Sequence, residues 1–371
     1  MSDFSPGLEG VIAGETSICT ITEEGLFYRG YPIAELARSC SFEEVAHLLL
    51  CGELPGREAL RDFSSQLARS RAVPAELREL VRRIPAGAPP MDALRSAVSL
   101  QAHFEPEVGD GSHDANVRKS IRLLAQLPAL LAEWHAARRG ETAPAPRPEE
   151  GQAAYLLRSL TGREPDPEAV RAMDVSLILY AEHELNASTF AARVVVSTLS
   201  DLHSGIVAAI GALKGPLHGG ANEAALAMLR EVGSPERADA WVRERLGRRE
   251  RIMGFGHRVV RQGDSRAVIL REVGEHLARA RGDLHWLETA DAIQETVERE
   301  KGLKPNVDFP CAWVYHLLGV PPDLYTPIFV AARTSGWCAH VIEQLDANRL
   351  IRPRAKYIGP EPRSVPPLEQ R

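Results

Sequence analysis

Four short stretches gather histidines, arginines, glycines and one aspartate outside clean amphipathic patterns. They are 182–194 (EHELNASTFAARV), 214–224 (KGPLHGGANEA), 254–266 (GFGHRVVRQGDSR) and 304–310 (KPNVDFP). A fifth, 332–340 (ARTSGWCAH), places an arginine inside a long apolar run. Imidazoles and carboxylates move protons, and guanidinium groups bind carboxylates and phosphates. These residue types indicate acid–base chemistry on an anionic ligand.

His218 stands between Pro216 and two glycines, just before a predicted helix. A helix N-terminus disfavours a positive charge beside it, so a histidine there tends to stay neutral. A neutral imidazole can donate an N–H to a developing oxyanion, in partnership with a carboxylate base. The alternative is a capping or solvent-exposed histidine, and this stretch alone favours neither.

Asp308 has prolines and apolar residues around it, in contrast to most solvated aspartates. Burial would raise the pKa of its carboxyl and make it a better base. The alternative is an N-cap for a helix that begins near Cys311, and the local sequence somewhat favours that alternative.

The stretch 254–266 combines three glycines with one histidine and three arginines. Glycines let the backbone approach a ligand closely, and clustered arginines suit phosphates or carboxylates. A basic surface loop is the alternative. The stretch is not a dinucleotide-binding fingerprint, because Val259 stands where the third glycine belongs. The stretch around Lys214 is not a P-loop either, because Gly215 follows the lysine where a P-loop has Ser or Thr. The residues concerned are Gly254, Gly256, His257, Arg258, Arg261 and Arg266.

His183 and Arg333 lie in segments predicted to be helical and buried. A buried arginine needs an anionic partner, here an acidic side chain such as Glu182 or Glu343, or a substrate carboxylate. The stretch around His183 is not a zinc-protease motif, because Ala187 replaces the second histidine. No other spacing suggests a metal site.

The composition is that of a globular protein with 44% apolar and 25% charged residues and a net charge of −6. Its 371 residues suggest two to three domains. The net charge argues against nucleic-acid or anionic-membrane partners. The five scattered cysteines, the absence of a secretory signal and the short apolar runs predict a cytoplasmic protein with no disulfides and no membrane span.

The elements that must position these residues are almost all helices. Residues 18–28 predict a short hairpin. Ser41 and Glu44 predict a capping box, and Gly52 ends that helix. The predicted fold class is therefore all-α and multi-helical, with a short N-terminal β-hairpin and an extended tail over 359–371. Further helices are expected at 57–70, 75–84, 91–104, 115–138, 151–161, 168–199, 204–213, 222–232, 235–248, 266–281, 284–300, 311–318 and 327–346.

These blocks, in this order, resemble the citrate synthase family, which includes the 2-methylcitrate synthases. The resemblance runs essentially from end to end and extends to GLEGVIAGETSICTI, YRGYPIAELA, SFEEVAHLLLCGELP and PMDALRSAVS. It implies condensation of acetyl-CoA with oxaloacetate and water to citrate and CoA, through an enol or enolate and thioester hydrolysis. The CoA thioester would be a co-substrate, with no tightly bound cofactor.

The resemblance also implies a role for each site residue. Asp308 would remove the α-proton, His218 would stabilise the enol, and His257 would act on the oxaloacetate carbonyl. His183, Arg266 and Arg333 would hold the oxaloacetate carboxylates. In a homodimer, Arg352 would reach in from the other subunit, although Arg354 is close enough to be the residue instead. Arg261, with Arg258, Gly254 and Gly256, would contact coenzyme A.

The resemblance implies two domains that close over the site. The large domain would comprise 1–219 and 319–371, and the small domain 220–318. Two local departures from the family pattern are Ser265 before Arg266 and the residues after Asp308. The alternatives are a 2-methylcitrate synthase that uses propionyl-CoA, an enzyme with both activities, and, ranked lower, a non-catalytic homologue that binds CoA or dicarboxylates.

Overall fold

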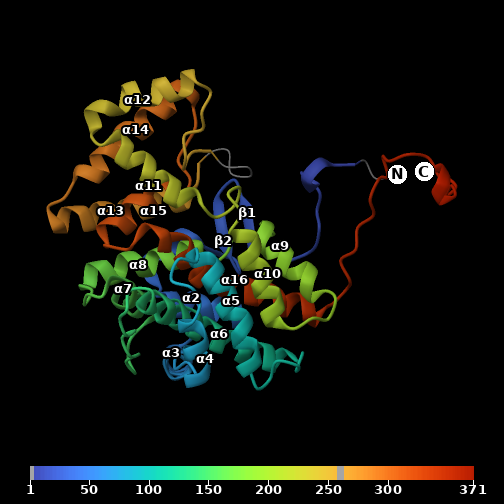
Figure 1. Cartoon of the computed structure of the whole chain (residues 1–371). Helices are drawn as coiled ribbons and strands as arrows, with labels where there is room; N and C mark the ends of the chain where they lie inside the picture. The colour runs from blue at the N-terminus through green and yellow to red at the C-terminus, as the bar shows by residue number, and fades with distance from the viewer. Residues whose placement is uncertain (1–3, 257–262) are drawn as a thin grey trace.

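The computed structural model describes residues 4–256 and 263–371. Most of this part of the chain is helical, and one small sheet lies near its N-terminus (Figure 1). The predicted fold class is therefore confirmed.

The predicted hairpin is present and gains a third short strand. Strand β1 (Cys19–Thr22) pairs antiparallel with β2 (Gly25–Tyr28), with Cys19 opposite Tyr28 and Thr22 opposite Gly25. Strand β3 (Tyr31–Pro32) then pairs with β2. Cys19, Leu26 and Tyr28 are buried, so one face of the sheet packs on the helices.

The larger group of helices surrounds α16 (Tyr325–Asp346), which is buried along most of its length. Its small residues allow close crossings: a Cβ atom on Gly336 would lie 2.3 Å from the carbonyl oxygen of Ala181. Helix α16 packs against α2, α6, α8, α9 and α10. The other helices of this group are α1 (Ile33–Ser39), α2 (Phe42–Cys51), α3 (Arg57–Ser70), α4 (Ala75–Arg82), α5 (Pro90–Gln101), α6 (His113–Ala137), α7 (Gln152–Thr161), α8 (Pro167–Tyr180), α9 (Ala187–Val196) and α10 (Leu202–Leu213).

A second group of helices lies beside the first and is built around α15 (Asp308–Leu317) (Figure 1). Helix α13 crosses α15 closely, because a Cβ atom on Gly274 would lie 2.4 Å from the Trp313 ring. Helix α13 also packs against α8 of the first group. This arrangement agrees with a small domain over 220–318, a division that stays a prediction. The group comprises α11 (Ala221–Val232), α12 (Pro235–Gly247), α13 (Ser265–Arg281), α14 (His285–Lys301) and α15.

The capping box is confirmed, because the Ser41 hydroxyl accepts from the Glu44 N–H and the Glu44 carboxylate accepts from the Ser41 N–H. Gly52 ends α2 in the left-handed conformation, with φ 90°. The prediction of one long helix over 168–199 was wrong. Helix α8 stops at Tyr180, and α9 starts only at Ala187, where the Asn186 side chain accepts from two backbone N–H groups.

Candidate active site

Asp308 is the first residue of α15, so it is not the N-cap of a later helix. The Asn306 side chain accepts a hydrogen bond from the backbone N–H of Asp308. The Asp308 carboxylate takes no part in this contact. Its Oδ1 atom accepts a hydrogen bond of 2.7 Å from the hydroxyl of Tyr180, at the end of α8.

The pKa of Asp308 is raised from 3.8 to about 6. Burial is the main cause, because it disfavours the charged form. The Tyr180 hydrogen bond and the charges of Arg266 and Arg333 act in the opposite direction. The result is a carboxylate that is ionised at neutral pH yet basic enough to accept a proton.

His218 precedes α11 and faces the N-terminus of α9. Its Nε2 atom lies 2.8 Å from the Ser188 hydroxyl and accepts from the Ser188 backbone N–H at 3.3 Å. Because a backbone N–H can only donate, Nε2 is the unprotonated nitrogen and Nδ1 carries the hydrogen. Burial and then the charge of Arg333 lower the pKa of His218 to about 4. His218 is therefore neutral, as in the first of the two alternatives that the sequence left open, but burial and Arg333 are the causes, not the helix N-terminus.

Arg333 is buried in the middle of α16, and its charge lowers the pKa of both His218 and Asp308. Its Nε donates to the Tyr180 carbonyl oxygen at 2.6 Å, and its guanidinium lies 4.8 Å from the centre of the Phe329 ring. The charge of Glu182 favours the ionised form of Arg333, but the contacts that the structure shows for Glu182 and Glu343 are with other side chains. Glu182 contacts His340 at 3.1 Å, and Glu343 forms an ion pair with Arg193 at 2.6 Å. Burial lowers the pKa of Arg333, which makes an anion beside it favourable.

Arg266 lies at the start of α13 and is also buried. It forms a two-pronged ion pair with Asp264, with N···O distances of 2.9 and 2.8 Å, and this contact contributes to raising its pKa. Asp264 accepts in addition from the backbone N–H of Val307. The pair therefore ties the start of α13 to the turn that presents Asp308.

Gly254 and Gly256 have φ values of +82° and +79°, which other residues rarely adopt. Hydrogen bonds join the Gly256 N–H to Lys304 and the Asn306 N–H to the Gly254 carbonyl, both at 2.9 Å. A Cβ atom on Gly254 would lie 2.7 Å from that of Phe309. Packing and backbone conformation are therefore sufficient reasons for a glycine at position 254, apart from any contact with a ligand. Three predicted residues, His257, Arg258 and Arg261, lie outside the described residues.

The structure corrects the surroundings of His183 and separates Arg352 from the other residues. His183 lies in the break between α8 and α9, not in a helix, and is half-buried. Arg352 is exposed on the extended chain after α16, which runs out from the body alongside the N-terminal segment (Figure 1).

Three residues around the site were missed by sequence reasoning: Tyr180, Ser188 and Asp264. Tyr180 ends an apolar run that reads as core. Ser188 follows the Asn186 cap, which a search for helix-start residues could have found. Asp264 stands two residues before Arg266, where a local ion pair is possible. For Tyr180 the sequence carries no signal, since its partner is 128 residues away.

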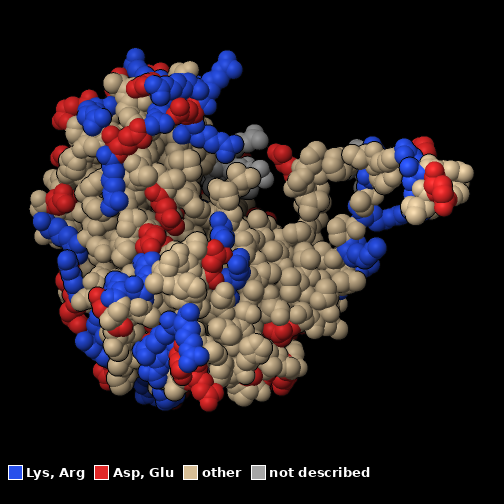
Figure 2. Space-filling model, in the orientation of Figure 1, with Lys and Arg blue, Asp and Glu red and all other residues tan. Residues whose placement is uncertain are grey.

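The described residues contain no cluster of side chains that could hold a metal ion. Among the helices described, none is both long and apolar enough for a membrane span. Figure 2 shows basic and acidic side chains interspersed over this face of the body.

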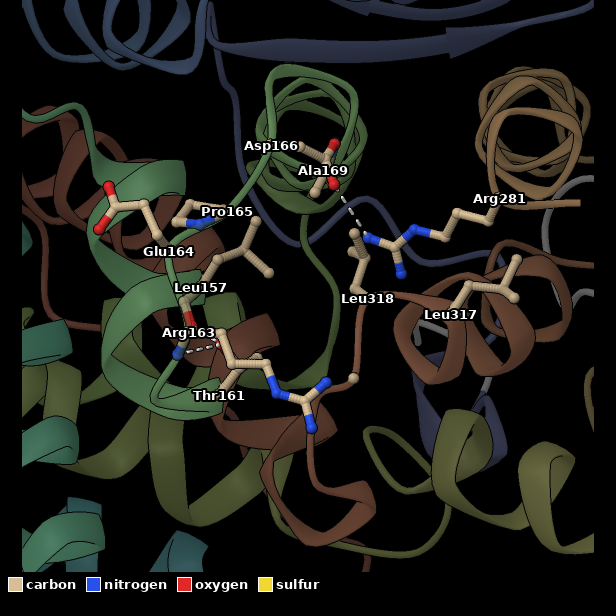
Figure 3. Close-up of a pocket in the computed structure, with 11 residues that line it drawn as sticks. Leu157, Thr161, Arg163, Glu164, Pro165, Asp166, Ala169, Arg281, Leu317 and Leu318 are labelled. Carbon is tan, nitrogen blue, oxygen red and sulfur yellow. Dashed lines mark hydrogen bonds and ion pairs between the residues drawn. The ribbon is translucent and has the colours of Figure 1, made fainter. Parts of the chain in front are cut away.

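A separate pocket of about 260 Å³ lies between α7, α8, α13 and the end of α15 (Figure 3). An ion pair of 3.4 Å between Arg281 and Asp166 crosses its edge. None of the predicted site residues lines this pocket.

Comparisons with known proteins agree on one family. The model of the citrate synthase C-terminal domain matches residues 7–354. Citrate synthase 2 of Bacillus subtilis is 48% identical over 98% of both chains. 2-methylcitrate synthase 1 of Corynebacterium glutamicum is 45% identical over 100% of this chain and 99% of its own.

Solved structures of the family superpose over nearly the whole chain. The citrate synthase of Pyrobaculum aerophilum is 40% identical, with a TM-score of 0.91 over 99% of this chain and 95% of its own. The Thermoplasma acidophilum citrate synthase, solved as a ternary complex with carboxymethyl coenzyme A and oxaloacetate, is 34% identical, with a TM-score of 0.93 over the whole of both chains. The chain therefore belongs to the citrate synthase family of acyltransferases.

Proposed function

We propose that the protein is a citrate synthase, which condenses acetyl-CoA with oxaloacetate and water to give citrate and CoA. One observation carries this proposal. Asp308 accepts from Tyr180, whose carbonyl oxygen accepts from Arg333. His218 contacts Ser188, which accepts from Trp337, one turn after Arg333 on α16. A carboxylate base and a neutral N–H donor are thus both linked to the same buried stretch of α16. The complex of the Thermoplasma relative with a CoA analogue and oxaloacetate supports the choice of substrates.

The proposed first step is removal of a methyl proton of acetyl-CoA by Asp308. A C–H bond beside a thioester is a very weak acid, so the oxygen of the developing enolate must be stabilised. Nδ1–H of His218 can donate to that oxygen, and it adds no positive charge that would compete for the proton. The enol carbon then attacks the ketone of oxaloacetate, with His257 acting on the carbonyl oxygen as it becomes an alkoxide.

Oxaloacetate is a dianion and needs several converging cations. His183, Arg266 and Arg333 are the proposed ligands of its carboxylates, with Arg352 supplied by a second subunit. The position of His183 supports this role, because it lies in the break between α8 and α9, half-buried and outside both helices. Arg258, Arg261, Gly254 and Gly256 are the proposed contacts of coenzyme A, with the 220–318 domain closing over it. Hydrolysis of the citryl thioester then releases CoA.

The homodimer is part of this proposal. Helix α10 carries no charged residue, and the one charged residue of α9, Arg193, is buried in contacts with α16. Charge-poor helices are typical of a subunit interface. The described cysteines are free, which supports the cytoplasm as the place of the reaction.

The test is the release of thiol from acetyl-CoA in the presence of oxaloacetate. Asp308→Asn and His218→Ala should each lower kcat by at least about 100-fold, because each removes a group needed to form or stabilise the enolate. Circular dichroism and thermal unfolding should show that both variants still fold. Unchanged turnover in a folded variant would overturn the assignment.

A second candidate function is 2-methylcitrate synthesis from propionyl-CoA, favoured by the relative of that name at 45% identity. One extra methyl group changes binding by only about 1–3 kcal/mol, so an enzyme with both activities is also compatible with this site. Values of kcat/KM for acetyl-CoA and propionyl-CoA at saturating oxaloacetate decide between them.

A further inference from the structure

We propose that Tyr180 is a positioning residue that holds the Asp308 carboxylate ionised and in a fixed orientation by donating its phenol hydrogen to it. This inference rests on the proposed function, in which Asp308 is the base. The hydrogen bond of 2.7 Å joins the last residue of α8 to the first residue of α15, and so it links the two groups of helices.

Tyr180 contacts α16 through both its backbone and its side chain. Its carbonyl oxygen accepts from Nε of Arg333 at 2.6 Å, and its ring packs on Phe329 with centroids 4.3 Å apart. Phe329 also lies against the Arg333 guanidinium. Backbone and side chain of Tyr180 thus connect the proposed base with the proposed oxaloacetate ligand, which fixes the distance between the groups that bind the two substrates.

The direction of proton donation follows from burial. The pKa of Tyr180 lies well above its ordinary value, first because of burial and then because of the Asp308 charge, so the phenol keeps its hydrogen at any working pH. It can therefore only donate to the carboxylate, which favours the ionised form of Asp308. Among the influences that lower the pKa of Asp308, this hydrogen bond is the largest, and it opposes the effect of burial.

Other titratable or charged groups face Asp308 from each neighbouring element. Arg266 and Arg333 lower its pKa and Asp264 raises it, while the Cys311 thiol lies one turn further along α15. Arg266 is paired with Asp264, and Nε of Arg333 is bound to the Tyr180 carbonyl. Tyr180 is the side chain through which the described part of the protein donates a hydrogen bond to this carboxylate.

The decisive variant is Tyr180→Phe, which keeps the ring, the contact with Phe329 and the backbone carbonyl that holds Arg333. With the hydroxyl gone, the acid limb of kcat/KM for acetyl-CoA should move up by about one pH unit, because the ionised form of Asp308 loses its donor. Below that limb, kcat/KM for acetyl-CoA should therefore fall about tenfold relative to the wild type. The KM for oxaloacetate should stay within about twofold, because the Arg333 contact does not use the hydroxyl.

Tyr315→Phe is the matched control. Tyr315 is buried on the same helix as Asp308, and its hydroxyl bonds to Ser176 at 2.7 Å and not to Asp308. This variant also loses a buried hydroxyl, but it should leave the acid limb in place. If both variants shift the limb equally, or if neither does, Tyr180 has no specific role in positioning the base.

Replacing Tyr180 with 3-fluorotyrosine covers the case in which Tyr180→Phe fails to fold. The fluorinated phenol is more acidic and a stronger donor, so the acid limb should move down; an unmoved limb would overturn the proposal. The wild type is the reference for both the proposed function and the proposed role of Tyr180. A wild type that releases no CoA from either acyl-CoA refutes the proposed function, whereas an active wild type with unshifted variants refutes only the role of Tyr180.

Discussion

At the scale of single residues, Asp308 has a pKa suited to catalysis at a cost in stability. Its pKa rises from 3.8 to about 6 on folding, mainly through burial. The folded chain then binds the proton more tightly than the unfolded chain does. Proton binding therefore stabilises the folded state fully below the unfolded pKa, and this stabilisation is lost as the pH rises through 6. At pH 8 the ionised carboxylate opposes folding by at most about 3 kcal/mol.

We therefore expect Asp308→Asn to stabilise the protein at pH 8 while abolishing activity. The asparagine keeps an oxygen for the Tyr180 hydroxyl but carries no charge into the buried site. The gain in Tm over the wild type should be larger at pH 8 than at pH 4.5, where the native carboxyl is already mostly protonated. Glu149→Gln, at an exposed carboxyl in the loop 138–151, is the control and should give no such difference. Equal gains of Asp308→Asn at both pH values would contradict the argument.

The side chains proposed for the site are easier to single out in the sequence than the residues that contact them. His218, Asp308 and Arg333 stand out because each interrupts a pattern, by glycines, by prolines or by a charge in an apolar helix. Tyr180 interrupts nothing, since a tyrosine is ordinary at the end of an apolar run. Its contact with Asp308 exists only because α8 and α15 meet in the folded chain, and no local pattern encodes that meeting.

At the scale of elements, the chain from Gly254 to Gly256 and the turn before α15 form one unit. An isolated bridge pairs Phe255 with Pro305, and the Phe255 and Phe309 rings pack with centroids 4.6 Å apart. This pairing places the glycine stretch directly against the residue that follows Asp308. A change in the glycine stretch should therefore reach the proposed base through packing alone.

Gly254→Ala tests this coupling. The new methyl group would lie 2.7 Å from the Cβ of Phe309, on a backbone with φ +82°. We expect a loss of roughly 2–4 kcal/mol of unfolding free energy in urea, from overpacking and from the left-handed conformation together. The control is Gly247→Ala at the exposed end of α12, where a Cβ meets open space and the change should be within about 0.5 kcal/mol. If Gly254→Ala is as stable as its control, the close packing is wrong.

Helices with a clear apolar face and a cap were predictable to within a few residues, as α2 and α14 show. The break between α8 and α9 was not, because apolar residues continue on both sides of it and mask the interruption. There Glu184 adopts φ 55°, and Asn186 satisfies the first N–H groups of α9. Helix α1 was missed because its seven residues are too few to establish a period.

At the scale of the whole molecule, both chain ends leave the body and carry exposed apolar side chains. Ile12 is 91% exposed near one end, and Ile358 is 90% exposed near the other. Such segments gain stability when a second subunit covers them. Arg352 lies on the C-terminal segment, close to the point where Ile351 is tied to Ser197. Arg352 lies away from the candidate site of its own subunit, and in a dimer the same segment would be able to reach the site of the partner subunit.

Mixing two inactive variants tests this arrangement. In a heterodimer of Arg352→Ala and Asp308→Asn subunits, one site would combine an intact Asp308 with the partner's intact arginine. After subunit exchange at equal concentrations, about a quarter of the wild-type activity should return, since half of the dimers are mixed and each has one complete site. If Arg352 serves its own subunit, every site lacks one group and no activity returns. Arg354→Ala in place of Arg352→Ala decides which of the two arginines crosses, because only the variant of the crossing residue is inactive alone and rescued in the mixture.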